Sequence, residues 1–200
     1  MTGECVQIEG DNQLRANVYS LLAALLARPP GEELLERLQQ IEEADADQGL
    51  MTTAWQHLKQ ASLRCSGSAL QDEYQQLFIG LGRGELVPYG SWYLTGFLME
   101  KPLARLRRDL ARLGIARRET TVEPEDHIAS ICEAMAMLIG QPEEYTWEIQ
   151  RRFFLDHIIP WAADFFSDLV KAKQANFYRS VGSLGLSFLD VEKEYLAMEP

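Results

Sequence analysis

The residues best suited to acid–base or ligand chemistry are an adjacent aspartate and histidine, Asp126 and His127. Adjacent residues on a helix diverge by about 100°, so these two side chains would not form a hydrogen-bonded catalytic dyad. We expect Asp126 to lie in the first turn of a helix that begins at Pro124, where the helix dipole stabilises a carboxylate. His127 is then placed to meet Glu123 or Ile131. Spacing alone therefore favours a capping acid and a packed histidine.

Histidines and cysteines are too dispersed to predict a metal site. His57, His127 and His157 lie far apart in the sequence, and neither an HxxxH nor a CxxC spacing occurs. The cysteines are three in number and widely spaced, which argues against a disulfide framework and fits a reducing cytosol. They are Cys5, Cys65 and Cys132. We predict no metal site and a cytoplasmic location.

A glycine-rich segment at residues 80–84 has the spacing GxGxG. It lies between two expected helices, and it lacks both a preceding strand and the Lys-Ser/Thr pair of a phosphate-binding loop. We interpret it as a flexible connection between helices. No GxSxG motif and no activated cysteine indicate a nucleophile. We therefore predict that the chain is not an enzyme; the enzymatic alternative is a nucleotide hydrolase that uses Asp126 and His127.

Aromatic residues gather on both sides of the glycine-rich segment 80–90. Most aromatic side chains of a helical domain belong to its core. Those beside a glycine-rich loop could instead line a groove, because glycine permits a close approach of the backbone. Before the loop lie Tyr74 and Phe78, and after it lie Tyr89, Trp92, Tyr93 and Phe97.

Hydrophobic spacing predicts helices along the whole chain and no strand. A first helix is expected to be capped by Asp11 or Asn12 and to stop at Pro29-Pro30-Gly31. Further helices are expected over 32–41, 50–63, 68–78 with Ser68 as the cap, 91–99, 102–113, 124–139, 143–167, 176–189 and 191–196. Pro160 should kink or split its helix, and a break is expected near Gly185.

These elements predict an all-α fold, a single-domain helical bundle of roughly eight to ten helices. The domain spans residues 1–200, with candidate hinges near 80–90 and 114–123. No stretch of apolar residues is long enough to span a membrane. The start of the chain lacks the basic and apolar regions of a secretory signal.

Charge points to a basic partner. The net charge is −11 and the pI is about 4.8, so a nucleic acid would be repelled and a basic peptide attracted. Residues 101–118 carry seven basic side chains and one acidic, whereas residues 119–150 carry eight acidic side chains and neither Lys nor Arg. Either the two stretches form solvated faces that pair in space, or part of the acidic stretch receives a cationic ligand.

Two longer motifs are specific enough to suggest a family. The first is Glu73-Tyr74-Gln75-Gln76-Leu77-Phe78, followed by Gly80, Gly82 and Pro88-Tyr89-Gly90-Ser91-Trp92-Tyr93. The second is Glu123-Pro124-Glu125-Asp126-His127-Ile128, followed by Glu133 and Met135. They resemble the signatures of the TorD/DmsD redox-enzyme maturation chaperones. Phe153, His157, Trp161 and the helix that ends at Pro29-Pro30 also fit. Gly90 departs from the pattern, since many relatives carry serine or another small residue there.

The resemblance implies an all-helical cytoplasmic chaperone without a cofactor of its own. Such a chaperone binds the twin-arginine leader of a molybdopterin-containing oxidoreductase, of the dimethyl sulfoxide or trimethylamine oxide reductase type. It holds the apo enzyme until the cofactor is inserted before export. Guanine nucleotide binding is linked to some relatives, although this chain lacks the phosphate motif. Relatives occur as domain-swapped dimers, so this chain is expected as a monomer or as such a dimer.

Carried onto this chain, the leader site comprises Leu77, Phe78, Tyr89, Ser91, Trp92, Tyr93, Glu123, Asp126 and His127. Carboxylates can bind a guanidinium through two hydrogen bonds, and aromatic rings can cover the apolar part of a leader. The alternative is a helical adaptor, similar to nitrate reductase assembly chaperones, that binds the mature enzyme and ignores leaders.

Overall fold

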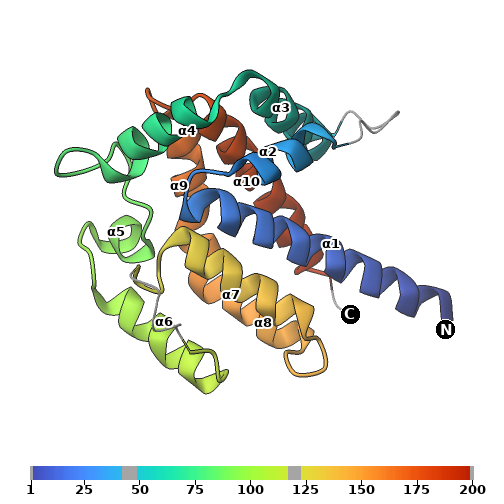
Figure 1. Ribbon diagram of the computed structural model, residues 1–200. Coiled ribbons are helices and arrows are strands. Elements are labelled where there is room, and N and C mark those ends of the chain that lie inside the picture. The colour runs from blue at the N-terminus through green and yellow to red at the C-terminus, as the bar shows by residue number, and fades with distance from the viewer. Residues whose placement is uncertain (1, 42–48, 117–122, 199–200) are drawn as a thin grey trace. The chain divides into compact units, whose positions relative to one another are not determined.

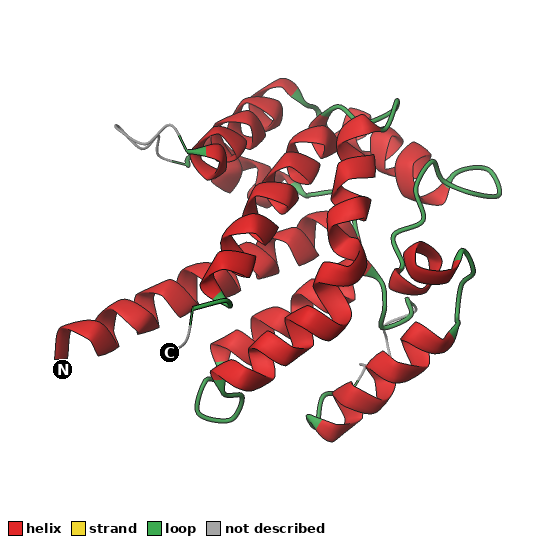
Figure 2. Cartoon of the chain, turned by 180° about the vertical axis from the view of Figure 1, so that it is seen from behind, coloured by secondary structure: helices red, strands yellow, loops and turns green. Residues whose placement is uncertain are grey.

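The computed structural model describes residues 2–41, 49–116 and 123–198. Every regular element in these ranges is a helix, and Figure 2 accordingly draws no strand there. The single extended pairing among the described residues is an isolated antiparallel bridge between Tyr89 and His127. The prediction of an all-α fold is confirmed.

The chain divides into two compact units. Unit 1 comprises Met1–Ala27, Tyr89–Ala162 and Glu194–Pro200, and unit 2 comprises Arg28–Pro88 and Ala163–Lys193. One crossing between the units falls at the end of the glycine-rich segment 80–90, which is one of the two candidate hinges. The other candidate, 114–123, lies partly outside the described residues. The single-domain organisation and the two hinges stay predictions.

In unit 1, α1 (Thr2–Ala27) packs along α7 (Ile128–Gly140), as Figure 1 shows. Both helices bury apolar side chains, among them Leu22, Leu25, Ile131 and Met135. The prediction that Asp11 or Asn12 caps the first helix is wrong, because α1 continues upstream to Thr2. The Asn12 side chain instead accepts hydrogen bonds from the buried Arg15 at 2.8 Å and from Tyr195 at 3.3 Å.

Unit 1 also contains α5 (Gly90–Thr95) and α6 (Lys101–Arg112), which contact each other. The helix α6 is amphipathic: Leu103, Leu106 and Leu110 are buried at helical spacing while its arginines are exposed. Pro102 lies in its first turn as predicted. The predicted helix over 91–99 is shorter than expected, because Gly96 adopts a left-handed conformation and ends α5.

The chain then runs through α8 (Trp147–Phe153), the π-helical turn η2 (Phe154–Ile158) and α9 (Ile159–Lys171) without leaving the helical region. Helix α8 begins at Trp147 rather than at the predicted residue 143. The wider π turn ends just before Pro160, whose ring would clash with the backbone of a regular helix one turn earlier. The predicted irregularity at Pro160 is therefore a π turn.

Unit 2 contains α2 (Glu32–Gln39), which contacts α3 (Leu50–Arg64), and the helix α4 (Gly67–Tyr74), which continues into the π turn η1 (Gln75–Ile79). The predicted cap of α4, Ser68, is wrong: Ser66 caps the helix by accepting the Ala69 N–H at 3.4 Å. The backbone of the glycine-rich segment then turns so tightly that a side chain at Gly80 would overlap the Arg83 carbonyl.

Helix α10 (Phe177–Tyr195) is continuous, so the break predicted near Gly185 is wrong. Gly185 is buried, and a Cβ atom there would overlap the Phe166 ring of the α9 segment in unit 2. The glycine permits close helix packing here, and packing of an apolar face offsets its low helix propensity.

Candidate functional site

The two sequence motifs meet in unit 1 at Asp126. The Gly90 N–H donates to the Asp126 carbonyl at 2.8 Å, and the Ser91 N–H donates to Asp126 Oδ2 at 2.8 Å. The prediction that Asp126 lies in the first turn of its own helix is wrong, because α7 begins at Ile128 with His127 as its N-cap. Asp126 instead binds the N-terminus of α5, where backbone N–H groups that have no acceptor within the helix attract a carboxylate.

Asp126 is only partly satisfied by these contacts. Its side chain is buried, with 3% of the residue exposed, and its Oδ1 has no hydrogen-bond partner among the described residues. The hydroxyl of the fully buried Ser91 also has no hydrogen-bond partner among the described residues. A buried acceptor without a partner costs about 1–3 kcal/mol, and more when it is charged. The arrangement therefore leaves one carboxylate oxygen available to a ligand that donates hydrogen bonds.

His127 supports this loop in its neutral form. Its Nδ1 accepts the Ala129 N–H at 3.1 Å, and its ring meets the Tyr89 ring edge to face with centroids 5.1 Å apart. Burial lowers the pKa of His127 to about 4, although the charges of Glu123 and Asp126 oppose the shift. His127 is therefore uncharged at neutral pH and does not repel a cation beside Asp126. The Tyr89 hydroxyl, in turn, hydrogen-bonds the Glu123 carboxylate.

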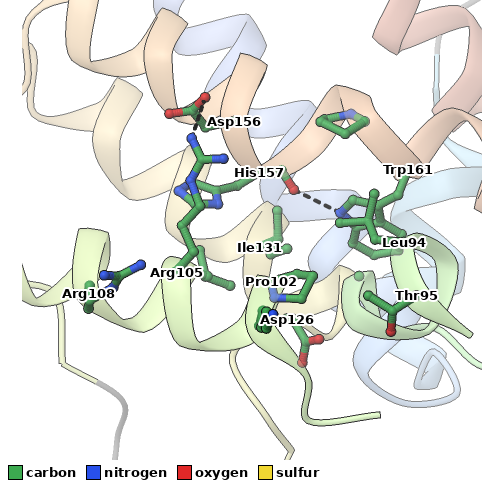
Figure 3. Close-up of a pocket in the computed structure, with 14 residues that line it drawn as sticks. Leu94, Thr95, Pro102, Arg105, Arg108, Asp126, Ile131, Asp156, His157 and Trp161 are labelled. Carbon is green, nitrogen blue, oxygen red and sulfur yellow. Dashed lines mark hydrogen bonds and ion pairs between the residues drawn. The ribbon is translucent and has the colours of Figure 1, made fainter. Parts of the chain in front are cut away.

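Asp126 lines a cavity of about 470 Å³ within unit 1, which Figure 3 shows in close-up. The Trp161 indole N–H donates to the His157 carbonyl at 2.8 Å and so fixes the ring in the cavity wall. Tyr93 packs near this ring, with centroids 5.8 Å apart. The lining residues are Gly90, Leu94, Thr95, Lys101, Pro102, Arg105, Leu106, Arg108, Asp126, Ile131, Asp156, His157, Pro160 and Trp161.

Helix α6 supplies the basic side of this cavity. Arg105 forms an ion pair with Asp156 at 2.9 Å, drawn as a dashed line in Figure 3. On the same helix Arg107 pairs with Glu125 at 2.8 Å. The basic and acidic stretches of the sequence thus pair in space at Arg107 and Glu125. Asp126, in the acidic stretch, keeps one oxygen without a partner among residues 2–41, 49–116 and 123–198.

A second cavity, of about 190 Å³, shares Asp156 and His157 with the first and is lined mainly by apolar groups of the segments α6, α8 and η2. His157 Nε2 lies 3.0 Å from Asp109 Oδ2. Burial lowers the pKa of His157, and its hydrogen bond to Asp109 acts in the opposite direction. Sequence reasoning did not place His157 and Trp161 in the site, although their spacing of four residues puts them on one helical face.

The other predicted site residues lie in different settings. Leu77 is fully buried in unit 2, and Phe78 packs there against Tyr74 and Tyr178 with ring centroids 4.9 and 5.4 Å apart. In unit 1 Tyr89, Ser91, Glu123, Asp126 and His127 come together, and Trp92 and Tyr93 follow on α5. The assignment of all nine residues to a leader site stays a prediction.

Comparison with known proteins identifies the family. The family model described as nitrate reductase delta subunit matches residues 43–167, which is more than half of the chain. The chain belongs to this family. TorD and DmsD chaperones are also among the relatives that match the chain, so the resemblance inferred from the two motifs is confirmed.

The individual relatives are chaperones. One is the chaperone protein TorD of Vibrio atlanticus, 26% identical over 208 residues, with 94% of this chain and 97% of the relative covered. Another is the Tat proofreading chaperone DmsD of Haemophilus influenzae, 31% identical over 122 residues, with 60% and 58% covered. The prediction of a maturation chaperone rather than an enzyme is confirmed.

A solved structure shows the same fold. The crystal structure described as a redox enzyme maturation protein from Archaeoglobus fulgidus aligns with a TM-score of 0.57 and 21% identity, covering 88% of this chain and 94% of that one. Within the described residues, no helix has the length and apolar character needed to cross a membrane. The same residues contain no group of three His, Cys, Asp or Glu side chains arranged to hold a metal ion.

Proposed function

We propose that this chaperone binds the twin-arginine leader of a molybdopterin-containing oxidoreductase in the cytoplasm. It holds the apo enzyme until the cofactor is inserted, and it releases the enzyme for export. The relative from Haemophilus influenzae, whose name refers to twin-arginine (Tat) proofreading, supports this class of partner. The site residues support it independently.

The observation that carries the proposal is the buried, half-satisfied carboxylate of Asp126 beside a cavity. A guanidinium offers five N–H donors in a planar fork, and it is more weakly hydrated than an ammonium group. One arm of the fork would satisfy Oδ1, and the other would use the remaining lone pair of Oδ2, which already accepts the Ser91 N–H. An arginine of the leader thus relieves the cost of the buried acceptor.

Within the loop 123–127, the neighbours of Asp126 carry no positive charge and so fit a cationic ligand rather than an anion. His127 is neutral, and Glu123 lies at the edge of the same loop, where it holds Tyr89. The net charge of −11 adds a long-range attraction for a basic leader, which screening by salt weakens. Binding should therefore weaken as ionic strength rises.

Calorimetric titration with synthetic leaders of the host's molybdenum oxidoreductases tests the proposal, each leader being compared with a twin-lysine version. We expect micromolar or tighter binding to one leader and weaker binding to its twin-lysine version. Asp126→Asn keeps the size of the side chain but presents an N–H group to the guanidinium, so binding should weaken about 10- to 100-fold. Asp11→Asn, which changes the net charge equally from a distant part of α1, is the control.

Two results would contradict the proposal. If no leader binds, the site is not a leader site. If Asp126→Asn lowers the melting temperature strongly and leaves the affinity of the folded protein unchanged, Asp126 is structural.

An adaptor that grips the mature enzyme is the second candidate, because the matching family is described as nitrate reductase delta subunit. Such an adaptor would bind an oxidoreductase whose leader has been removed. Pull-down of the apo enzyme with and without its leader separates the two functions. Retention that does not depend on the leader would favour the adaptor.

A further inference from the structure

Four large apolar side chains lie exposed within six residues of chain after the start of α5. Leu94, Phe97, Leu98 and Met99 are 44%, 69%, 49% and 75% exposed. Single exposed apolar residues are ordinary on a protein surface, whereas a contiguous group marks a binding surface. We name these four residues the 94–99 strip.

The backbone of the strip is held in a defined shape. The Thr95 hydroxyl donates to the Ser91 carbonyl at 2.8 Å, and its oxygen accepts the Phe97 N–H at 3.2 Å. Gly96 and Met99 both have positive φ angles, of 78° and 61°. A positive φ is strained for methionine and easy for glycine. The strip therefore presents its side chains from a fixed loop, at the cost of backbone strain at Met99.

The strip borders the cavity that Asp126 lines. Leu94 and Thr95 line this cavity just before the strip's other residues, and Lys101 and Pro102 line it just after them. Helix α5 begins at Gly90, where Asp126 accepts the Ser91 N–H, and ends at Thr95. Four residues of helix rise about 6 Å. An extended peptide advances about 3.3 Å per residue, so side chains two to four residues from an arginine at Asp126 reach the strip.

The chemical groups around the 94–99 strip indicate which ligand binds it. Export signals place a basic region before an apolar one. At this site Asp126 Oδ1, which has no partner among the residues that the structure describes, lies at one end of α5, and the strip begins at the other. A folded partner needs about 800 Å² on each side of a stable interface, more than four side chains provide.

We infer that the 94–99 strip binds the apolar stretch that follows the arginine pair of the leader, and so sets how strongly leaders of different apolar content are held. This inference rests on the proposed function, and it adds residues that neither sequence motif points to as a binding surface. The strip and the Asp126 cavity then form one continuous site within unit 1, with a charged end and an apolar end.

Titration of strip variants with the leader selected above, synthesised to include both arginines and the apolar stretch, tests the inference. Phe97→Ser should weaken binding about tenfold, since it removes an apolar contact of aromatic size. Met99→Gly should also weaken binding, while its melting temperature stays equal or rises because glycine relieves the positive φ. Leu14→Ser, at a residue 65% exposed on α1, is the matched control and should bind as the wild type does.

Leader variants complete the test. In a leader whose apolar residues nearest the arginines are replaced by serine, Phe97→Ser should cause no further loss, because the contact is already absent. Equal affinities of wild type and strip variants for the natural leader, with Asp126→Asn still defective, would overturn this inference and leave the proposed function standing. Failure of the wild type to bind any leader would remove both. A dimer that Phe97→Ser converts to a monomer with unchanged leader affinity would assign the strip to self-association.

Discussion

Two carboxylates of this chain bind the N-terminus of a helix far away in the sequence, and they do so to different extents. In unit 2 Glu73 uses both oxygens: Oε1 accepts the N–H groups of Asn176 and Tyr178, and Oε2 accepts that of Phe177, at 2.8 to 3.1 Å. In unit 1 Asp126 uses Oδ2 for the Ser91 N–H, and its Oδ1 has no partner in the part of the chain that the structure describes. The first is a complete cap of α10, and the second is an incomplete cap of α5 beside a cavity.

The difference predicts a structural role for Glu73 and a binding role for Asp126, although each carboxylate belongs to one of the two sequence motifs. Around Glu73 the rings of Tyr74, Phe78 and Tyr178 pack on one another. Around Asp126 the ring of Trp161, on which Tyr93 packs, lines a cavity. Hydrogen-bond satisfaction is therefore a better guide to function here than motif membership. A fully paired carboxylate supports the fold, and a half-paired one at a cavity is available to a ligand.

The largest effect should come from removing the complete cap. Glu73→Ala leaves three N–H groups at the start of α10 without their acceptor, so we expect the free energy of unfolding to fall by about 2–4 kcal/mol. Urea denaturation measures this change. Asp72→Ala, an exposed neighbour on the same helix, should change it by less than about 0.5 kcal/mol. Weakened leader binding by Glu73→Ala with undiminished stability would show that the two carboxylates do not differ as described.

Acid should lower the free energy of unfolding through His127, the residue that follows Asp126. His127 binds a proton near pH 6.5 when the chain is unfolded, but only near pH 4 when it is folded and buried. Between these values the unfolded chain holds more protons, so the stability present above pH 6.5 is lost as the pH falls toward 4. From pH 7 to pH 5 this loss amounts to about 2 kcal/mol.

The variant His127→Asn isolates this contribution. Asparagine is a good N-cap and can still accept the Ala129 N–H, but it does not titrate. Urea denaturation at pH 7 and pH 5 should therefore show a smaller loss for the variant than for the wild type. His157, whose pKa is also lowered, is present in both proteins and cancels in the comparison. Equal losses in the two proteins would mean that His127 is not held neutral beside Asp126.

The fold could be predicted from sequence where local patterns decide it. The leucines of α6, the proline in its first turn and the helical spacing along α1 and α7 each specify a helix without tertiary information. Element ends were predicted less well, since packing decides them. Gly185 was expected to break α10, yet its missing side chain is what lets the helix approach Phe166. Asn12 has the residue type of a cap, but it joins a network with Arg15 inside α1.

The site could be predicted only in part, because it too depends on contacts between segments that are far apart in the sequence. The motifs name Tyr89, Ser91, Asp126 and His127, and the structure brings these together. No pattern within one segment shows that Asp126 caps a helix 35 residues earlier in the chain, or that one of its oxygens has no partner among the described residues. Of the 94–99 strip, the aromatic pattern named only Phe97, because the segment was expected inside a helix that in fact ends at Thr95.

The smallest expected effect is that of a substitution at Gly90, in the wall of the cavity that Asp126 lines. A Cβ atom at Gly90 would lie 3.0 Å from Trp161 Nε1, and the indole is already fixed by its hydrogen bond to the His157 carbonyl. We expect Gly90→Ala to cost about 1 kcal/mol of stability and to weaken leader binding a few-fold, because the indole must shift at the edge of the Asp126 cavity. Gly140→Ala, at the end of α7 with open space around it, is the control and should be neutral or stabilising. If Gly90→Ala has the stability and the leader affinity of the wild type, the Trp161 indole can shift at little cost. The incomplete cap at Asp126 would then select a guanidinium by charge alone rather than by the shape of the cavity around it.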